Sequence, residues 1–87
     1  MNIVIYSTQT CGYCKMLKRY LDDHGMKYQE KLADSDENIA KELFEKSHGY
    51  AVPFTVISET SDDGTEKTIA EILGFDVPKV NAALGIK

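Results

Sequence analysis

Cys11 and Cys14 are the residues best suited to chemistry in this chain, because they are its only cysteines and only two residues separate them. The apolar run 3–6 before them is typical of a buried strand, and the apolar residues of 16–21 recur at helical spacing. We therefore expect the pair where a strand leads into a helix. A cysteine at a helix N-terminus meets unpaired backbone N–H groups and the positive end of the helix dipole, and both favour the thiolate. This placement is typical of a redox centre.

The helix position matters because only the thiolate is a good nucleophile. A free cysteine has a pKa near ~8.5, so about 3% of it is thiolate at pH 7, whereas a pKa of roughly 6 would give about 90%. Lys15, Lys18 and Arg19 follow in the same predicted helix and bring positive charge near the pair. Taken one at a time, each of these cations is more simply explained as part of a solvated helix face.

Length and charge limit what kind of protein this is. A chain of 87 residues is expected to form a single domain, 1–87, with a small core. The net charge of −4 argues against a nucleic-acid binder, which needs a basic face. No run is long enough to cross a bilayer and no export signal is visible, so we expect a cytoplasmic protein without a membrane partner.

Cysteine usage then narrows the chemistry. In the cytoplasm a lone Cys-x-x-Cys is catalytic or metal-binding rather than a structural disulfide. A structural zinc site needs four ligands, and the chain has neither a second Cys-x-x-Cys nor a suitably spaced histidine pair, so no metal site is expected.

The first half of the chain predicts a helix, a strand and a second helix after the first strand. Gly25 is expected to end the first helix, and 27–31 is suited to a second strand. Asp34 or Ser35 would cap the next helix, which is expected to stop near His48. The predicted apolar stripe of that helix consists of Ile39, Ala40, Leu43 and Phe44.

The second half predicts a hairpin and a final helix. Pro53 introduces a β-rich run at 54–57, and after an Asp-Asp-Gly turn the segment 65–70 is expected to return as its partner strand. Apolar residues around position 70 also fit helical spacing, so this fourth strand could end early. Gly74 breaks the run, and Asp76 would cap the last helix. The predicted order is β-α-β-α-β-β-α, an α/β fold.

Three motifs, in order along the chain, resemble the glutaredoxin family, which has the thioredoxin fold. Cys11-Gly12-Tyr13-Cys14 matches a family site most often written Cys-Pro-Tyr-Cys. Val52-Pro53 resembles the family's Thr-Val-Pro, and Gly74-Phe75-Asp76 is similar to the segment that opens its last helix. The resemblance covers essentially the whole chain and implies a four-stranded mixed sheet with three helices.

The resemblance also implies roles for the two cysteines. Cys11 would be the nucleophile, and Cys14, one turn inside the helix and less accessible, the resolving thiol. The nucleophile attacks a substrate disulfide to form a mixed disulfide, and a second thiolate then displaces the product.

Other family roles concern glutathione. Pro53 would follow a cis peptide bond and lie against the disulfide, and the backbone of Val52 would hold the cysteinyl part of glutathione. Tyr13 and Gly74 would line the same groove. Asp76 would face the glutathione amino group, a role compatible with capping the last helix. Glutathione would then be a co-substrate, with no tightly bound cofactor.

Departures from the family pattern leave the electron donor open. Many glutaredoxins, and the redoxins served by thioredoxin reductase, carry a lysine where this chain has Thr8. Ala51 replaces the usual threonine, and Phe75 with Gly74 is closer to the reductase-served redoxins. The hairpin at 58–67 is longer than usual in the family, and its role is open.

We therefore expect a thiol-disulfide oxidoreductase, a monomer that reduces protein disulfides or glutathione mixed disulfides. One alternative is a redoxin that thioredoxin reductase reduces and that supplies electrons to ribonucleotide reductase. Another is a glutathione-dependent [2Fe-2S] cluster carrier, which Gly12 permits because some cluster-binding glutaredoxins have glycine or serine in place of the motif proline.

Overall fold

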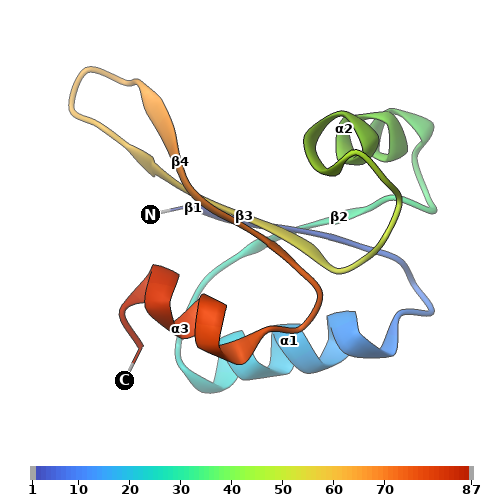
Figure 1. The fold of residues 1–87 in the computed structure, drawn as a ribbon, viewed down its shortest axis with the longest axis horizontal. Helices are drawn as coiled ribbons and strands as arrows, with labels where there is room; N and C mark the ends of the chain where they lie inside the picture. Colours follow the sequence, from blue (N-terminus) through green and yellow to red (C-terminus); the bar gives the residue numbers. More distant parts are fainter. Residues whose placement is uncertain (1, 87) are drawn as a thin grey trace.

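The computed structural model describes residues 2–86, and its centre is a four-stranded mixed sheet in the order β2-β1-β3-β4 (Figure 1). The strands are β1 (Asn2–Ser7), β2 (Gln29–Leu32), β3 (Phe54–Thr60) and β4 (Glu66–Leu73), and the helices are α1 (Gly12–Asp23), α2 (Glu37–Ser47) and α3 (Val77–Leu84). β1 runs parallel to β2 and antiparallel to β3, which is antiparallel to β4. The predicted element order and mixed sheet are confirmed. The predicted domain 1–87 also includes Met1 and Lys87, which lie outside the described residues.

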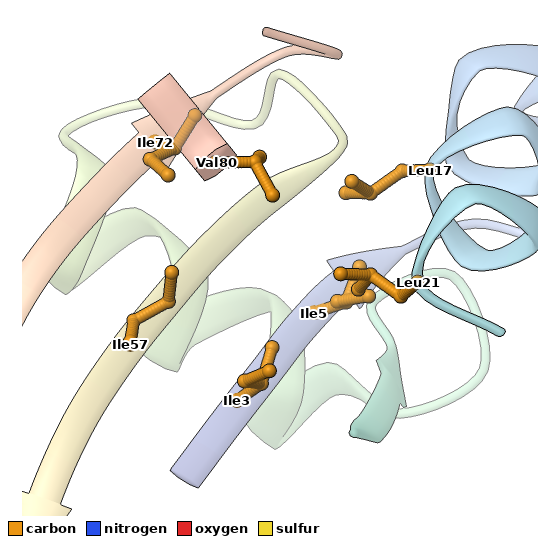
Figure 2. Packing of buried hydrophobic residues seen from close by; sticks show 7 residues of the cluster. All are labelled: Ile3, Ile5, Leu17, Leu21, Ile57, Ile72 and Val80. Atoms are coloured by element: carbon orange, nitrogen blue, oxygen red, sulfur yellow. The ribbon is translucent and has the colours of Figure 1, made fainter. Parts of the chain in front are cut away.

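The main core lies between the sheet and the two helices α1 and α3, which cover the same face of it (Figure 1). Figure 2 shows its seven buried residues, which come from three strands and both helices: Ile3, Ile5, Leu17, Leu21, Ile57, Ile72 and Val80. Truncating a buried leucine to alanine costs ~2–5 kcal/mol, so these few side chains carry a large share of the stability. The core fixes α1, and with it the cysteine pair, against the end of β1.

A second, smaller core lies on the opposite face, under α2. Its buried members are Tyr6, Leu43, Phe54 and Val56. Phe44, predicted to belong to the apolar stripe of α2, is 47% exposed instead and stacks on Tyr50 with ring centroids 5.1 Å apart. Leu73, at the end of β4, is 57% exposed. This face of the sheet therefore leaves large apolar side chains accessible.

Two predicted strand boundaries were wrong. β2 occupies Gln29–Leu32 rather than 27–31, because its register is set by pairing with the buried end of β1. β4 does not end at residue 70 but continues to Leu73. A bulge opposite Ile57 and Ser58 leaves one extra residue in β4, and this interrupts the alternation of apolar and polar residues that would have marked the strand.

Helix ends agree with the predicted breaks in most places. Gly25 follows the C-cap of α1 with φ +69°, and the Met26 N–H donates to the Leu21 carbonyl at 2.9 Å, as in a Schellman motif. α2 ends at His48, which itself adopts a left-handed conformation with φ 61°. Asp76 caps α3 as predicted. Within residues 2–86, no helix has the length and apolar character needed to cross a membrane.

Candidate active site

Cys11 lies at the N-cap of α1, where the strand-to-helix loop ends. Its backbone N–H donates to the Thr8 carbonyl at 3.3 Å, and its carbonyl accepts from the Lys15 N–H at 3.3 Å as the helix begins. Its sulfur accepts a hydrogen bond from the Cys14 N–H at 3.1 Å. Sulfur thus takes the capping position that a side-chain oxygen usually fills, and it pairs with one of the N–H groups of the first helical turn.

The two cysteines form a disulfide, with Cα atoms 5.3 Å apart. They differ in exposure: Cys14 is fully buried, whereas Cys11 is partly accessible. A substrate can therefore reach Cys11 before Cys14. This is the difference in accessibility that the family resemblance implied.

The loop before Cys11 is anchored by residues from the turn between β2 and α2. The Gln9 backbone N–H donates to Asp34 Oδ2 at 3.0 Å, and Gln9 Nε2 donates to Ser35 Oγ at 2.9 Å. The prediction that Asp34 or Ser35 caps α2 was therefore wrong. Asp36 is the cap, and its Oδ1 accepts from the Asn38 N–H at 2.8 Å. The sequence has three consecutive cap-forming residues at 34–36, although a helix needs only one. This excess was the signal that the other two bind elsewhere, here to Gln9.

A polar cluster ties the end of β1 to β2 and α1. The buried Ser7 hydroxyl donates to Glu30 Oε2 at 2.7 Å, and Lys18 Nζ lies 2.6 Å from the same oxygen. Burial raises the pKa of Glu30, but hydrogen bonds from Lys18 and Ser7 outweigh it and hold that pKa below its ordinary value. Lys18 is thus paired rather than freely solvated, so Glu30 offsets part of the positive charge expected near the cysteines.

The second and third motifs meet at the start of β3. The Val52-Pro53 peptide bond is cis, as the family resemblance implied, and Pro53 is buried. The Gly74 N–H donates to the Pro53 carbonyl at 2.8 Å. Gly74 has φ +81°, a conformation that glycine adopts without a side-chain penalty. Among the hydrogen bonds of residues 2–86, none involves the backbone groups of Val52, so both can pair with a substrate.

Tyr13 and Asp76, the remaining predicted site residues, lie at the beginnings of two helices. Tyr13 is in the first turn of α1 and is 66% exposed. Asp76 Oδ1 accepts from the Lys79 N–H at 3.2 Å, and its Oδ2 lies 3.8 Å from Lys79 Nζ. Within residues 2–86, neither side chain is hydrogen-bonded to another predicted site residue. The structure therefore joins Cys11 with Cys14 and Pro53 with Gly74, and leaves the exposed Tyr13 and the half-buried Asp76 as separate groups.

Comparison with known proteins agrees with this arrangement. The glutaredoxin family model matches residues 3–80. A glutaredoxin from Pseudomonas aeruginosa is 34% identical over 64 residues, which cover 74% of this chain and 76% of that protein.

Two solved structures show the same fold. NrdH-redoxin from Escherichia coli, described as a glutaredoxin-like protein with a thioredoxin-like activity profile, is 21% identical with a TM-score of 0.71, covering 94% of this chain and 93% of that one. Buckwheat glutaredoxin in complex with glutathione is 26% identical with a TM-score of 0.63, covering 97% of this chain and 70% of that one. With its cysteine pair at the start of α1, the chain belongs to the glutaredoxin family, thioredoxin-fold proteins whose general activity is thiol-disulfide exchange.

Proposed function

We propose that this protein reduces protein disulfides and glutathione mixed disulfides, with Cys11 as the nucleophile and Cys14 as the resolving thiol. The difference between the two sulfurs is the observation that carries the proposal. Cys11 is partly accessible at the N-cap of α1, whereas Cys14 is fully buried one turn further along. A helix N-terminus stabilises a thiolate, so the accessible sulfur is also the one that is activated.

The proposed reaction has two exchange steps. The Cys11 thiolate attacks one sulfur of a substrate disulfide, forming a mixed disulfide and releasing the other substrate sulfur as a thiolate, which takes a proton from water. Either Cys14 or a glutathione thiolate then attacks the mixed disulfide and releases the reduced substrate. Two electrons pass from the protein to the substrate when Cys14 is the attacking group, and the Cys11–Cys14 disulfide is the oxidised product.

Glutathione is the proposed electron donor. Val52 offers unpaired backbone groups next to Pro53, as an extended cysteinyl segment requires. Tyr13 offers an exposed ring beside Cys11, and Asp76 offers a negative charge at the start of α3. The glutathione complex of the buckwheat relative supports this assignment. The Gly74–Pro53 hydrogen bond would hold the proposed groove in shape.

Thioredoxin reductase is the second candidate donor, with ribonucleotide reductase as the acceptor of the electrons. Exposed Leu73 and half-buried Phe75 flank Gly74 where glutaredoxins usually carry small residues, and an apolar rim suits a protein partner. Thr8 lacks the charge that would attract a glutathione carboxylate. The thioredoxin-like activity described for the NrdH-redoxin also supports this candidate.

The [2Fe-2S] carrier remains a less favoured alternative. A cluster would draw on Cys11 alone in each copy of the chain, because Cys14 is fully buried. The other thiolate ligands would have to come from glutathione and a second copy. We propose that the protein acts as a cytoplasmic monomer instead, since thiols there are kept reduced and a dithiol can turn over.

A pair of coupled NADPH assays tests the donor. One contains glutathione and glutathione reductase, the other contains thioredoxin reductase, and both use the same glutathionylated peptide. We expect turnover in the first assay to exceed that in the second, and Cys11→Ser to be inactive in both. Turnover only with thioredoxin reductase would show that this reductase, and not glutathione, is the electron donor. Absence of turnover in both assays would contradict the proposed function.

A further inference from the structure

Thr55 carries a buried hydroxyl with no hydrogen-bond partner. Within residues 2–86, its Oγ1 is the only buried side-chain nitrogen or oxygen without one, and the residue is 1% exposed. Burying an unpaired hydroxyl costs stability. Valine has the same shape and an equal preference for strands, and would avoid that cost. The stability of the disulfide form therefore does not explain why this position carries threonine rather than valine.

The strand register places Thr55 on the face of the sheet that α1 and α3 cover. Thr55 pairs with Ile5 of β1 on one side and with Ile72 of β4 on the other. Directly opposed residues point to the same face of a sheet, and both isoleucines belong to the core that α1 and α3 cover. Figure 2 shows Leu17 of α1 and Val80 of α3 pointing toward each other over this part of the sheet. Thr55 thus lies on the apolar face of the sheet that α1 and α3 cover.

Cys14 lies on the buried side of α1. It precedes Leu17 by three residues, so the two side chains share one face of α1, about 4.5 Å apart along the helix axis. Cys14 is fully buried, as is Pro53, which directly precedes β3 and stands two residues before Thr55. The unpaired hydroxyl therefore lies on the face of the sheet that α1 covers, and the buried sulfur lies on the face of α1 that is turned toward that sheet.

After reduction, the buried Cys14 sulfur requires a hydrogen-bond donor that it does not require in the disulfide. When the Cys11–Cys14 bond accepts two electrons and two protons, Cys14 becomes a thiol enclosed by apolar groups. To resolve a mixed disulfide it must lose its proton and attack Cys11 Sγ. The Cys11–Cys14 bond then forms, the bond to the substrate breaks, and the substrate sulfur leaves and takes a proton from water. A thiolate buried without a hydrogen-bond donor is costly.

We infer that the Thr55 hydroxyl donates a hydrogen bond to the Cys14 sulfur in the reduced protein, directly or through one water. The hydroxyl is unpaired while Cys14 is in the disulfide and gains its partner when that bond opens. It therefore stabilises the dithiol form relative to the disulfide and makes Cys14 a better resolving group. The inference rests on the proposed dithiol function and extends it to a residue outside the three motifs.

Thr55→Val tests the inference, because it removes only the hydroxyl. The equilibrium between dithiol and disulfide is measured in glutathione redox buffers. Free thiols are alkylated, and mass spectrometry then gives the fractions of dithiol and disulfide protein. We expect Thr55→Val to favour the disulfide by at least about threefold, a shift of roughly 14 mV toward more negative potential. Release of a peptide from the mixed disulfide on Cys11 is expected to slow by about fivefold or more.

Two further variants separate the hydroxyl from packing. Thr55→Ser keeps the hydroxyl and is expected to stay within about twofold of wild type in the redox equilibrium. Ile57→Val removes a methylene from the same buried face and is expected to leave the equilibrium unchanged. The inference is wrong if Thr55→Val has the same dithiol–disulfide equilibrium constant as wild type. In that case Thr55→Val would raise the melting temperature equally in both redox states. It is also wrong if Thr55→Ser behaves like Thr55→Val. Because the equilibrium is measured without a reductase assay, loss of the proposed function would be seen separately.

Discussion

At the scale of single residues, the site depends on two cysteines that share one helical turn but not one environment. Cys11 caps α1 and is partly accessible, whereas Cys14 is buried against the sheet. In the proposed mechanism the first sulfur meets the substrate, and the second acts only on a group already attached to Cys11. The proposed order of reaction rests on this difference in burial.

This difference predicts unequal effects of replacing each cysteine. Cys11→Ser should lower activity by a thousandfold or more with every disulfide substrate, because the only other thiol of the chain, Cys14, is fully buried. Cys14→Ser should keep at least about a tenth of wild-type activity on glutathione mixed disulfides, since free glutathione can resolve them. With protein disulfides it should stall as a mixed disulfide, visible on a non-reducing gel. Retention of full protein-disulfide reduction by Cys14→Ser would contradict the assigned roles.

Asp76 provides a second prediction at this scale, because helix capping and glutathione binding can be separated there. Asp76→Asn should raise the apparent KM for glutathione by about two- to fivefold with kcat nearly unchanged, as expected for loss of an exposed ion pair. Its melting temperature should stay close to wild type because asparagine is an equally good cap.

Lys79→Met is the matched control for Asp76→Asn. Lys79 Nζ lies 3.8 Å from the Asp76 carboxylate and competes for it, so its removal should lower the KM for glutathione slightly. If both variants share the wild-type KM, Asp76 has only a capping role.

At the scale of elements, the turn 33–36 between β2 and α2 shows what local sequence rules can decide. They predicted a cap near this turn, and α2 does begin there. They could not choose among three cap-forming residues, because the choice depends on Gln9, which is distant in sequence and close in space. The same limit explains the error in β4, where the bulge is defined only by pairing with β3.

Separate roles for Asp34 and Asp36 can be tested by paired alanine substitutions. Asp36→Ala should cost about 1 kcal/mol, which for a domain of this size lowers the melting temperature by roughly 4–8 °C, with little loss of activity. Asp34→Ala should cost less stability but lower kcat/KM about two- to fivefold, because a hydrogen bond that positions the loop before Cys11 is lost. Thermal melts and steady-state kinetics on both variants check this, and the opposite pattern would contradict it.

At the scale of the whole molecule, the three motifs that the sequence showed as separate are brought to one end of the sheet by its topology (Figure 1). The position of the cysteine pair at the start of α1 and the cap at Asp76 could be anticipated, because each depends on neighbours in sequence. The cis bond before Pro53 was implied by the family resemblance. The Gly74–Pro53 hydrogen bond, the Ser7–Glu30–Lys18 cluster and the unpaired Thr55 hydroxyl could not, because each requires the strand register.

Acid stability is a prediction for the whole fold. Burial raises the pKa values of Glu30 and Glu42, but hydrogen bonds and cations outweigh it, so both fall below the ordinary 4.5. A carboxyl with a lowered folded-state pKa contributes stability that is complete above its unfolded-state pKa. That contribution is lost as pH falls through the folded-state value. The free energy of unfolding should therefore decline as pH drops below about 4.5.

Single substitutions assign this acid sensitivity to particular carboxyl groups. Glu30→Gln should lower the free energy of unfolding at pH 7 by about 1 kcal/mol and flatten its decline between about pH 4.5 and 2.5, as measured by urea titration. Glu45→Gln is the control, because Glu45 is exposed and forms no ion pair within residues 2–86. If the free energy of unfolding of Glu30→Gln declines with falling pH as steeply as that of wild type, the polar cluster at the end of β1 does not contribute to acid sensitivity.

The most direct test of the central claim is to identify which cysteine first carries the substrate. Fully reduced wild-type protein is mixed with a glutathionylated peptide, quenched in acid after increasing times and analysed by peptide mass spectrometry. We predict glutathione on Cys11 alone at early times, followed by the Cys11–Cys14 disulfide as the adduct decays. An adduct that forms first on Cys14, or reduced cysteines that never react with the peptide, would contradict the account.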